Sequence, residues 1–398
     1  MDVIDLEKQY CANNYDPLPV VLTRGRGVYV WNKQGKRYFD MMSAYSAVSH
    51  GHVHPRILSA LTTQVTQLAV MSRAFYTEKL GPFLQRACEL TGQDKALPMN
   101  TGAEAVETAL KAARKWAYTV KGVADDKAEI IACEGNFHGR TIAIVGLSSD
   151  EHYRKGFGPY PPGLVQIPFG DAKALENAIT PNTAAFLVEP VQGEGGIIIP
   201  PEGYLAECAA ICKKHNVLLI CDEIQTGLGR TGKFLACEHD NVKPDGLVLG
   251  KALGGGLLPV SMFLSSKEVM DVFTPGDHGS TFGGNPLAAA VGLEALNVTV
   301  EKQLPEQAVK LGAYFIEGLK GIDSAMIKDI RGKGLLIGVE IDPQHASARA
   351  VCEALMHKGV LTKETHETVV RFAPPLVITE KEIDQALELI KDTIENMP

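Results

Sequence analysis

The chain has 398 residues, of which 45% are hydrophobic and 22% are charged, and its formal net charge at pH 7 is -8. This length allows a large core and more than one domain. The acidic balance excludes broad binding along nucleic-acid phosphates, which requires a basic face.

No part of the sequence looks like a membrane span or an export signal. No apolar run approaches the roughly 18 residues that a spanning helix requires, and the first residues contain no basic stretch followed by an apolar one. The eight cysteines are scattered, without a Cys-x-x-Cys pair. We therefore expect a cytoplasmic protein with reduced thiols that binds neither membranes nor nucleic acid.

The first element expected along the chain is a β-hairpin at residues 27–40, where β-forming residues alternate on either side of a turn with Gly35. Three histidines at alternate positions follow, His50, His52 and His54, and such a group could ligate a metal. No acidic or cysteine side chain accompanies them in this stretch. We expect structural roles for the three histidines and no metal site.

A helix is expected at residues 100–120. Thr101 and Glu104 have the spacing of a capping box, which alone would explain both residues. The small residues Gly102 and Ala103 open the helix, and free N–H groups at such a start also form an anion site. A second candidate anion site is the pair of hydroxyl groups of Ser280 and Thr281.

The sequence beyond residue 100 alternates strands and helices. Residues 202–215 carry apolar side chains at helical spacing between two short apolar runs. Continuous apolar strands joined by amphipathic helices indicate an α/β fold, with a mostly parallel sheet covered on both faces. The apolar runs lie at residues 129–133, 184–188, 217–221 and 246–249.

The character of the sequence changes again after about residue 295. A helix at 305–320, a strand at 334–340 and a final helix at 380–395 indicate a smaller α+β domain. We therefore divide the chain into an N-terminal segment with the hairpin (1–48), a large domain (49–295) and a small C-terminal domain (296–398).

Three polar residues stand at the ends of predicted strands. Glu189, Asp222 and Lys251 each follow or end an apolar run, at separations close to one βαβ unit. In open α/β sheets the ligand crevice lies outside the carboxyl ends of the strands. We expect at least Asp222 and Lys251 to lie at one edge of the sheet and in one pocket.

A different class of function, nucleotide hydrolysis, is suggested by residues 227–234, which come close to a phosphate-binding loop. Phe234 occupies the position where a hydroxyl must reach Mg²⁺. The stretch also follows the acidic pair Asp222–Glu223 within a few residues instead of opening its own βα unit. An NTPase stays a remote alternative.

A phosphate cup, a strand-end carboxylate and a strand-end lysine are together what a pyridoxal 5'-phosphate (PLP) enzyme needs. The lysine amine forms a Schiff base with the cofactor, and the carboxylate keeps the pyridine nitrogen protonated. This hypothesis explains why one cation, Lys251, ends an apolar run, where an unused ammonium would be costly.

The chain resembles the class III aminotransferases of the fold-type-I PLP enzymes from about Tyr15 to its C-terminus. The resemblance implies a large domain with a mostly parallel sheet and a smaller C-terminal domain. It is carried by the Lys251 context and by the motifs at residues 100–105, 135–140, 189–194, 219–232 and 331–334.

The resemblance implies a role for each matched residue. Lys251 would be the Schiff-base lysine and Asp222 the partner of the ring nitrogen, while Gln225 contacts the 3-hydroxyl and Phe137 stacks on the ring. Gly102 and Ala103 would hold the phosphate, helped by Ser280 and Thr281 from a neighbouring subunit. A shared site of this kind makes a homodimer the smallest assembly. Glu189 would be structural.

Within the family, Tyr15, Tyr45, Arg140 and Arg371 resemble the members that transfer the δ-amino group of ornithine to 2-oxoglutarate. Tyr15 and Arg140 would suit the α-carboxylate of ornithine, with Tyr45 lining the same end. Arg371 would bind 2-oxoglutarate and be masked by Glu194 while ornithine is bound. Acetylornithine and 4-aminobutyrate aminotransferases remain alternatives, and His138 departs from the tryptophan that is usual in animal members.

Overall fold

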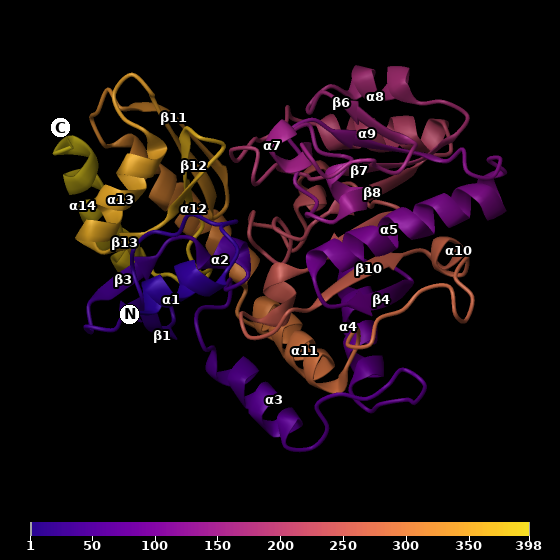
Figure 1. Cartoon of the computed structure of the whole chain (residues 1–398), viewed down its shortest axis with the longest axis horizontal. Coiled ribbons are helices and arrows are strands. Elements are labelled where there is room, and N and C mark those ends of the chain that lie inside the picture. The colour runs from indigo at the N-terminus through magenta and orange to yellow at the C-terminus, as the bar shows by residue number, and fades with distance from the viewer. Residues whose placement is uncertain (1, 398) are drawn as a thin grey trace.

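The computed structural model describes residues 2–397, which form two lobes (Figure 1). The larger lobe is built on a seven-stranded sheet with the order β4-β10-β9-β8-β7-β5-β6. Within this sheet β10 alone runs antiparallel to its neighbours, so the expected mostly parallel sheet is confirmed. The strands are β4 (Lys95–Met99), β5 (Glu129–Cys133), β6 (Leu164–Ile167), β7 (Thr183–Val188), β8 (Leu218–Asp222), β9 (Gly246–Leu249) and β10 (Ser261–Ser265).

The central strands are buried on both faces because consecutive side chains point into two different cores. Ile131 and Phe186 lie in one core, whereas their neighbours Ile130 and Leu187 lie in the other. Helix α5 (Gly102–Trp116) packs in the second core and continues into the π-helical turn η1 (Ala117–Lys121). The first core is covered by α4 (Leu80–Thr91), α8 (Ala172–Ala178), α9 (Tyr204–Lys214) and α11 (Pro286–Glu301).

The smaller lobe contains two four-stranded sheets with the orders β1-β2-β3-β13 and β11-β12-β15-β14. Its helices are α12 (Leu304–Lys320), α13 (Ala348–Lys358) and α14 (Glu380–Glu395). Its strands are β1 (Leu22–Arg26), β2 (Tyr29–Asn32), β3 (Arg37–Asp40), β11 (Ile327–Lys333), β12 (Leu336–Ile341), β13 (Val360–Leu361), β14 (Lys363–Thr365) and β15 (Val369–Phe372).

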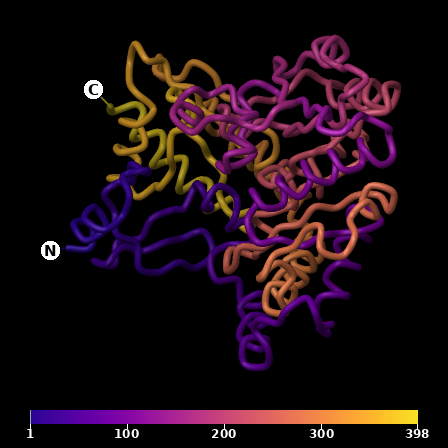
Figure 2. Tube along the Cα trace, turned by 45° about the vertical axis from the view of Figure 1, so that its right-hand side comes forward, coloured from indigo at the N-terminus to yellow at the C-terminus, as the bar shows by residue number. Residues whose placement is uncertain are grey.

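The two ends of the chain meet in this smaller lobe. Strand β13 pairs in parallel with β3, with Val360 opposite Phe39. Val28, Phe39 and Met41 belong to the same core as α12, α13 and α14. Figures 1 and 2 show the indigo N-terminal segment beside the yellow C-terminal one. The hairpin of β2 and β3 therefore packs as part of the C-terminal lobe.

The division of the chain into domains stays a proposal, and we move the limit between the large and the small domain. The predicted limit between residues 295 and 296 falls inside α11, which continues to Glu301. We propose the break between α11 and α12, because α11 packs in the core of the large lobe and α12 in that of the small one.

Residues 227–234 do not form a phosphate-binding loop, because they lead into the short 3-10 helix η2 (Ala236–Asp240) instead of opening a long helix. Their Arg230 is fully buried and donates to the carbonyl oxygens of Leu335 (2.9 Å) and Pro374 (2.6 Å) and to Ser49 Oγ (2.9 Å). The stretch thus joins the two lobes, and its glycines serve close packing.

Two of the three histidines at residues 50–54 make hydrogen bonds to protein groups. His50 is buried, and its Nε2 lies 2.8 Å from Thr299 Oγ1 and 3.1 Å from the Ala295 carbonyl oxygen. His52 Nε2 lies 2.7 Å from Asp40 Oδ2. These contacts connect the chain after the hairpin to α11 and to the end of β3.

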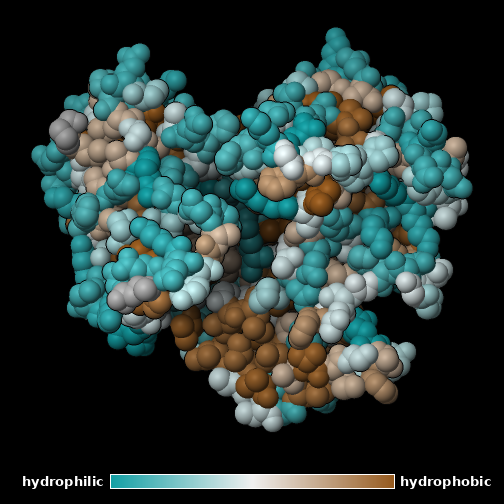
Figure 3. All heavy atoms as spheres, in the orientation of Figure 1, coloured by the Kyte–Doolittle hydropathy of each residue, from teal (hydrophilic) through white to brown (hydrophobic). Residues whose placement is uncertain are grey.

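The remaining short elements connect the lobes and cover the edges of the sheets. They are α1 (Val3–Tyr10), α2 (Ser43–Ser46), α3 (Pro55–Val65), α6 (Ile142–Val145), α7 (Glu151–Arg154), α10 (Lys267–Met270) and η3 (Lys251–Gly254). Apolar residues gather on the surface where Figure 1 places α3 and α11 (Figure 3). None of the helices within residues 2–397 combines the length and apolar character needed to cross a membrane.

Candidate functional site

A cavity of about 190 Å³ lies at the carboxyl ends of β7, β8 and β9, which are adjacent in the sheet. Glu189 follows β7, Asp222 ends β8, and Lys251 lies just beyond β9. The three strand-end residues thus share one pocket, as parallel strands require. The cavity is lined by Gly102, Ala103, Phe137, His138, Gly139, Glu189, Asp222, Ile224, Gln225, Thr226 and Lys251.

Lys251 occupies a strained position at the cavity wall. Its backbone φ is 43°, in the left-handed region that residues with a side chain seldom adopt. Strain of this kind persists where the surrounding structure holds it and is common at functional sites. Burial lowers the pKa of its ammonium, against the opposing effect of Glu194. A lowered pKa increases the fraction of neutral, nucleophilic amine.

Asp222 is held in a fixed orientation at the cavity floor. Its Oδ2 lies 2.7 Å from His138 Nδ1, and its Oδ1 accepts a hydrogen bond from the Ile224 N–H at 3.1 Å. Burial would lower the pKa of His138, but the hydrogen bond to Asp222 raises it overall. His138 thus braces the carboxylate of Asp222 through its Nδ1 atom. Its Nε2 is buried and has no hydrogen-bond partner among residues 2–397.

The start of α5 presents free N–H groups beside the cavity. Thr101 Oγ1 accepts from the Glu104 N–H at 3.3 Å, and Glu104 Oε2 accepts from the Thr101 N–H at 2.8 Å, so the expected capping box is present. Because a helix cannot satisfy its first N–H groups, those of Gly102 and Ala103 remain available. A Cβ on Gly102 would lie 2.9 Å from the Ile224 side chain, so glycine keeps this approach open.

Glu189 joins two loops that border the cavity. Its carboxylate accepts from the Phe137 N–H at 3.0 Å and from the Gly193 N–H at 3.4 Å. Burial raises the pKa of Glu189 to about 7, although the charge of His138 opposes the rise. Glu189 thus fixes the segment that carries Phe137 and the segment that carries Glu194.

Arg371 and Glu194 form a bidentate ion pair next to the cavity. The two N–O distances are 2.6 and 2.8 Å, and Arg371 is only 1% exposed. Burial alone would raise the pKa of Glu194, but the guanidinium charge lowers it to about 2. Gln225, a cavity residue, donates to Glu194 Oε1 at 3.2 Å. The pair is therefore charged and linked to the cavity wall.

The structure also places Tyr45 near Arg371, and Arg140 near Phe137. The Arg371 guanidinium carbon lies 5.2 Å from the centre of the Tyr45 ring. Tyr45 belongs to α2, in which residues 43–46 all have positive φ. The Arg140 guanidinium carbon lies 5.4 Å from the centre of the Phe137 ring. Tyr15, in contrast, is 74% exposed.

Ser280 and Thr281 do not line the cavity of their own chain. Ser280 Oγ accepts from the side-chain amide of Asn100 at 2.9 Å. Both hydroxyl residues line a separate surface hollow with residues 72–74. Within residues 2–397 of one chain, therefore, neither hydroxyl lines the cavity in which the phosphate is expected to bind.

Two residues at the site have no role assigned from the sequence: His138, which is noted there only as a departure from a family pattern, and Tyr153. Glu189 follows from the spacing of polar residues at strand ends, and its contacts fit the structural role expected for it. The contacts of His138 and Tyr153 join loops whose packing follows no sequence period.

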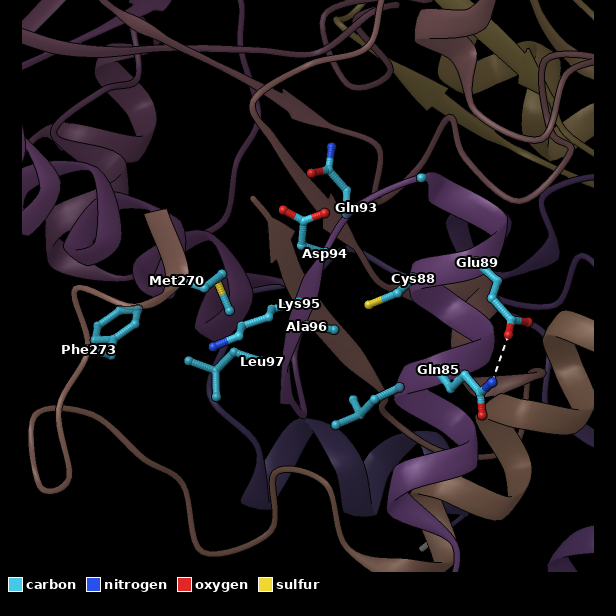
Figure 4. A pocket seen from close by; sticks show the side chains of 12 residues that line it. Gln85, Cys88, Glu89, Gln93, Asp94, Lys95, Ala96, Leu97, Met270 and Phe273 are labelled. Carbon is cyan, nitrogen blue, oxygen red and sulfur yellow. Dashed lines mark hydrogen bonds between the residues drawn. The ribbon is translucent and has the colours of Figure 1, made fainter. Parts of the chain in front are cut away.

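A larger groove, of about 680 Å³, lies elsewhere, between α4, β4 and α10 (Figure 4). It is lined mainly by apolar groups such as Leu97, Met270 and Phe273, with an ion pair between Lys95 and Asp271 at its border. None of the predicted site residues lines it, and the cavity at Lys251 is the better candidate despite its smaller volume.

The chain is similar to known proteins over nearly its whole length. The class-III aminotransferase family model matches residues 10–394. Ornithine aminotransferases of Geobacillus sp. (strain WCH70) and Bacillus subtilis (strain 168) are 59% and 56% identical, covering 98% and 99% of this chain and 97% and 98% of their own length.

Solved structures of the same kind superpose closely. An ornithine aminotransferase from Toxoplasma gondii, which holds PLP at partial occupancy in its active site, is 46% identical with a TM-score of 0.97, over 98% of this chain and 93% of the other. An acetylornithine aminotransferase from Elizabethkingia anophelis is 48% identical with a TM-score of 0.90, over 99% and 98%.

The raised pKa of Glu189 predicts a pH-dependent cost to stability. The folded carboxyl binds its proton more tightly than the unfolded one, so the free energy of unfolding falls as pH rises from about 4.5 to about 7. In the chain without ligand, Glu189→Gln should gain up to about 3 kcal/mol relative to wild type over this window. Denaturant unfolding at several pH values measures it. The exposed control Glu317→Gln should show a constant difference, and a constant difference for Glu189→Gln would contradict the prediction.

Proposed function

The chain belongs to the class-III aminotransferase family, and on that premise we propose that it transfers the δ-amino group of L-ornithine to 2-oxoglutarate. The products are glutamate and glutamate 5-semialdehyde, which cyclises to pyrroline-5-carboxylate. The observation that carries the proposal is the pair of arginines near the Lys251 cavity, one masked by Glu194 and one not. The cofactor is pyridoxal 5'-phosphate, as in the family.

The residues of the cavity fit this cofactor. The N–H groups of Gly102 and Ala103 suit a phosphate. Phe137 would stack on the pyridine ring, and Gln225 would contact its 3-hydroxyl. Asp222 has the carboxylate that a protonated pyridine nitrogen needs, and its contact with His138 Nδ1 fixes the orientation of that carboxylate. When bound, the cofactor supplies an electron sink for carbanion chemistry and carries the amino group between the two substrates.

Lys251 is the group that we propose for covalent attachment and proton transfer. Its amine would hold the cofactor and would move a proton as a general base and acid during turnover. The lowered pKa of the amine favours both roles. Asp222 would keep the pyridine nitrogen of the cofactor protonated.

Two carboxylate sites would separate the two substrates. For ornithine, Arg140 binds the α-carboxylate with help from Tyr15 and Tyr45, which leaves the δ-amine to reach Lys251. For 2-oxoglutarate, Arg371 binds the α-carboxylate close to the cofactor. While ornithine is bound, Glu194 masks Arg371, so that the α-amino acid end is not drawn to the wrong place.

The test of the cofactor assignment is Lys251→Ala. Borohydride treatment of the wild type followed by peptide mapping should place the cofactor on Lys251. The variant should keep weak cofactor binding through the helix start but lose turnover by about 10³-fold or more, because both attachment and proton transfer are lost. Steady-state rates with ornithine measure this, with the exposed Lys267→Ala as control. Near-normal activity in Lys251→Ala would refute the assignment.

The test of the masking pair is a comparison of the two half-reactions. Glu194→Ala should speed the half-reaction with glutamate relative to that with ornithine, since Arg371 is then unmasked. Arg140→Ala should weaken ornithine binding by roughly 2–3 kcal/mol through loss of a charge-assisted contact. Single-turnover measurements with each amino donor decide between the outcomes.

An equal slowing of both half-reactions in Glu194→Ala would make Glu194 only a structural partner of Arg371. Measuring acetylornithine and 4-aminobutyrate as amino donors with the wild type completes the test. If either is the better donor, the ornithine proposal fails and the aminotransferase activity stands.

We also propose a homodimer in which Ser280 and Thr281 reach the phosphate of the other subunit. This proposal is supported by their position outside their own cavity, beside residues 72–74. The same region carries exposed apolar side chains, which a second copy would cover: Val65, Leu68, Val70, Phe75 and Phe282.

We also propose a cytoplasmic location, which accords with the eight free cysteines.

Complementation between two inactive variants tests the shared site. Lys251→Ala and Thr281→Asp, refolded together in equal amounts, should form mixed dimers in which one of the two sites carries neither change. About a quarter of wild-type activity should return, since half of the random dimers are mixed and each has one intact site. Recovery of none, or a monomeric mass near 42.9 kDa in sedimentation, would contradict the shared site.

A further inference from the structure

The two arginines of the site are held by different kinds of contact. Arg371 is paired with a carboxylate through two hydrogen bonds. The contacts of the Arg140 guanidinium are instead with aromatic faces: its carbon lies 3.9 Å from the centre of the Tyr153 ring and 5.4 Å from that of Phe137. These two rings meet edge to face, with their centres 6.1 Å apart at 82°. Arg140 thus lies in an aromatic corner.

An aromatic contact holds a guanidinium without using its N–H donors. The attraction is between the cation and the electron-rich face of the ring, so the donors at the edge of the plane remain free. A bidentate ion pair, in contrast, consumes two donors and cancels the charge. Arg140 is therefore kept in place and still able to bind a carboxylate, while Arg371 is not until Glu194 leaves.

Tyr153 lines a second cavity and contacts, through Phe137, a wall of the cavity at Lys251. With Arg140 it lines a cavity of about 750 Å³ that also includes Asn14. Phe137, the other ring of the aromatic corner, lines the cavity of Lys251. A substrate that extends from one cavity into the other would pass the Arg140 guanidinium. Of the two rings, Tyr153 has its centre nearer to that guanidinium.

The local structure fixes the Tyr153 ring. Tyr153 belongs to the one-turn helix α7, whose first residues are capped by Asp150, with the Oδ1 atom accepting from the His152 N–H at 2.8 Å. Burial raises the pKa of the Tyr153 hydroxyl, against the opposing charge of Arg140, and the charges of Asp150 and Glu194 raise it further. The hydroxyl is thus neutral at physiological pH.

We propose that Tyr153 is a specificity-determining residue, whose ring positions Arg140 to receive the α-carboxylate of the amino donor. This inference rests on the proposed function, since it assigns Arg140 to that carboxylate. Tyr153 acts through Arg140 and is a positioning residue. Its loss should raise KM for the donor that uses Arg140 and leave the half-reaction that uses Arg371 unchanged.

The experiment compares three substitutions at residue 153 in the holoenzyme. Tyr153→Leu removes the ring, and we expect KM for ornithine to rise about 5- to 30-fold with kcat within about twofold. Tyr153→Phe and Tyr153→Trp keep an aromatic face and should stay within about threefold of wild type. The half-reaction with glutamate should change less than about twofold in all three. Phe157→Leu, which removes another ring from the same cavity, is the matched control.

A double-mutant cycle separates positioning from packing. In Arg140→Ala, the further change Tyr153→Leu should cost little more, because the ring then has no guanidinium to hold. Equal losses with ornithine and glutamate, a fall in kcat with KM unchanged, or additive losses in the cycle would each overturn the inference. A loss in Tyr153→Phe as large as in Tyr153→Leu would also overturn it, since the hydroxyl and not the ring would then matter.

The proposed function is tested separately by the wild-type rate with ornithine. If the wild type prefers acetylornithine, which also carries an α-carboxylate, the same variants are measured with that donor and the expected KM changes are the same. If the wild type prefers 4-aminobutyrate, which has no α-amino acid end, the inference is overturned together with the ornithine assignment. The absorbance of the bound cofactor and the unfolding temperature show that each variant is folded.

Discussion

The ion pair between Arg371 and Glu194 is the contact on which the arrangement of the site depends. Arg371 lies on β15 of the small lobe, and Glu194 lies in the loop that follows β7 of the large one. Removing the Glu194 carboxylate would leave the Arg371 guanidinium buried without its charged partner, which costs several kcal/mol. Each lobe therefore contributes one charged partner of the ion pair, so the pair forms only when the two lobes are packed together.

The loop around Glu194 is held from the small lobe by more than this pair. The Thr365 hydroxyl donates to the Glu194 carbonyl oxygen at 2.7 Å, and Arg331 donates to the Gly196 carbonyl oxygen at 2.7 Å. In the large lobe, the Glu189 carboxylate accepts a hydrogen bond from the Gly193 N–H and so holds the start of the same loop. Because the backbone is fastened on both sides, a rotation of the Glu194 side chain is a cheaper way to unmask Arg371 than a movement of the loop.

The sequence predicts the positions of Asp222 and Lys251 better than the contacts made by His138 and Tyr153. Asp222 and Lys251 could be placed together because the carboxyl ends of parallel strands coincide, and the capping box at Thr101 follows from local spacing alone. His138 and Tyr153 could not, since their partners lie 84 residues away and on another loop. The end of α11 at Glu301 cannot be read from the sequence, because the helix is apolar on most sides.

The parallel pairing of β3 with β13 has a consequence for how the protein is made. Residues 37–40 leave the ribosome early, but the strand that completes their sheet arrives only at residues 360–361. Arg371 is translated later still, ten residues after β13 ends. Contacts so distant in sequence form late, because a long loop must close first. The nascent chain can therefore build the sheet that carries Lys251 before it contains Arg371, so the two parts of the site come together at different stages of synthesis.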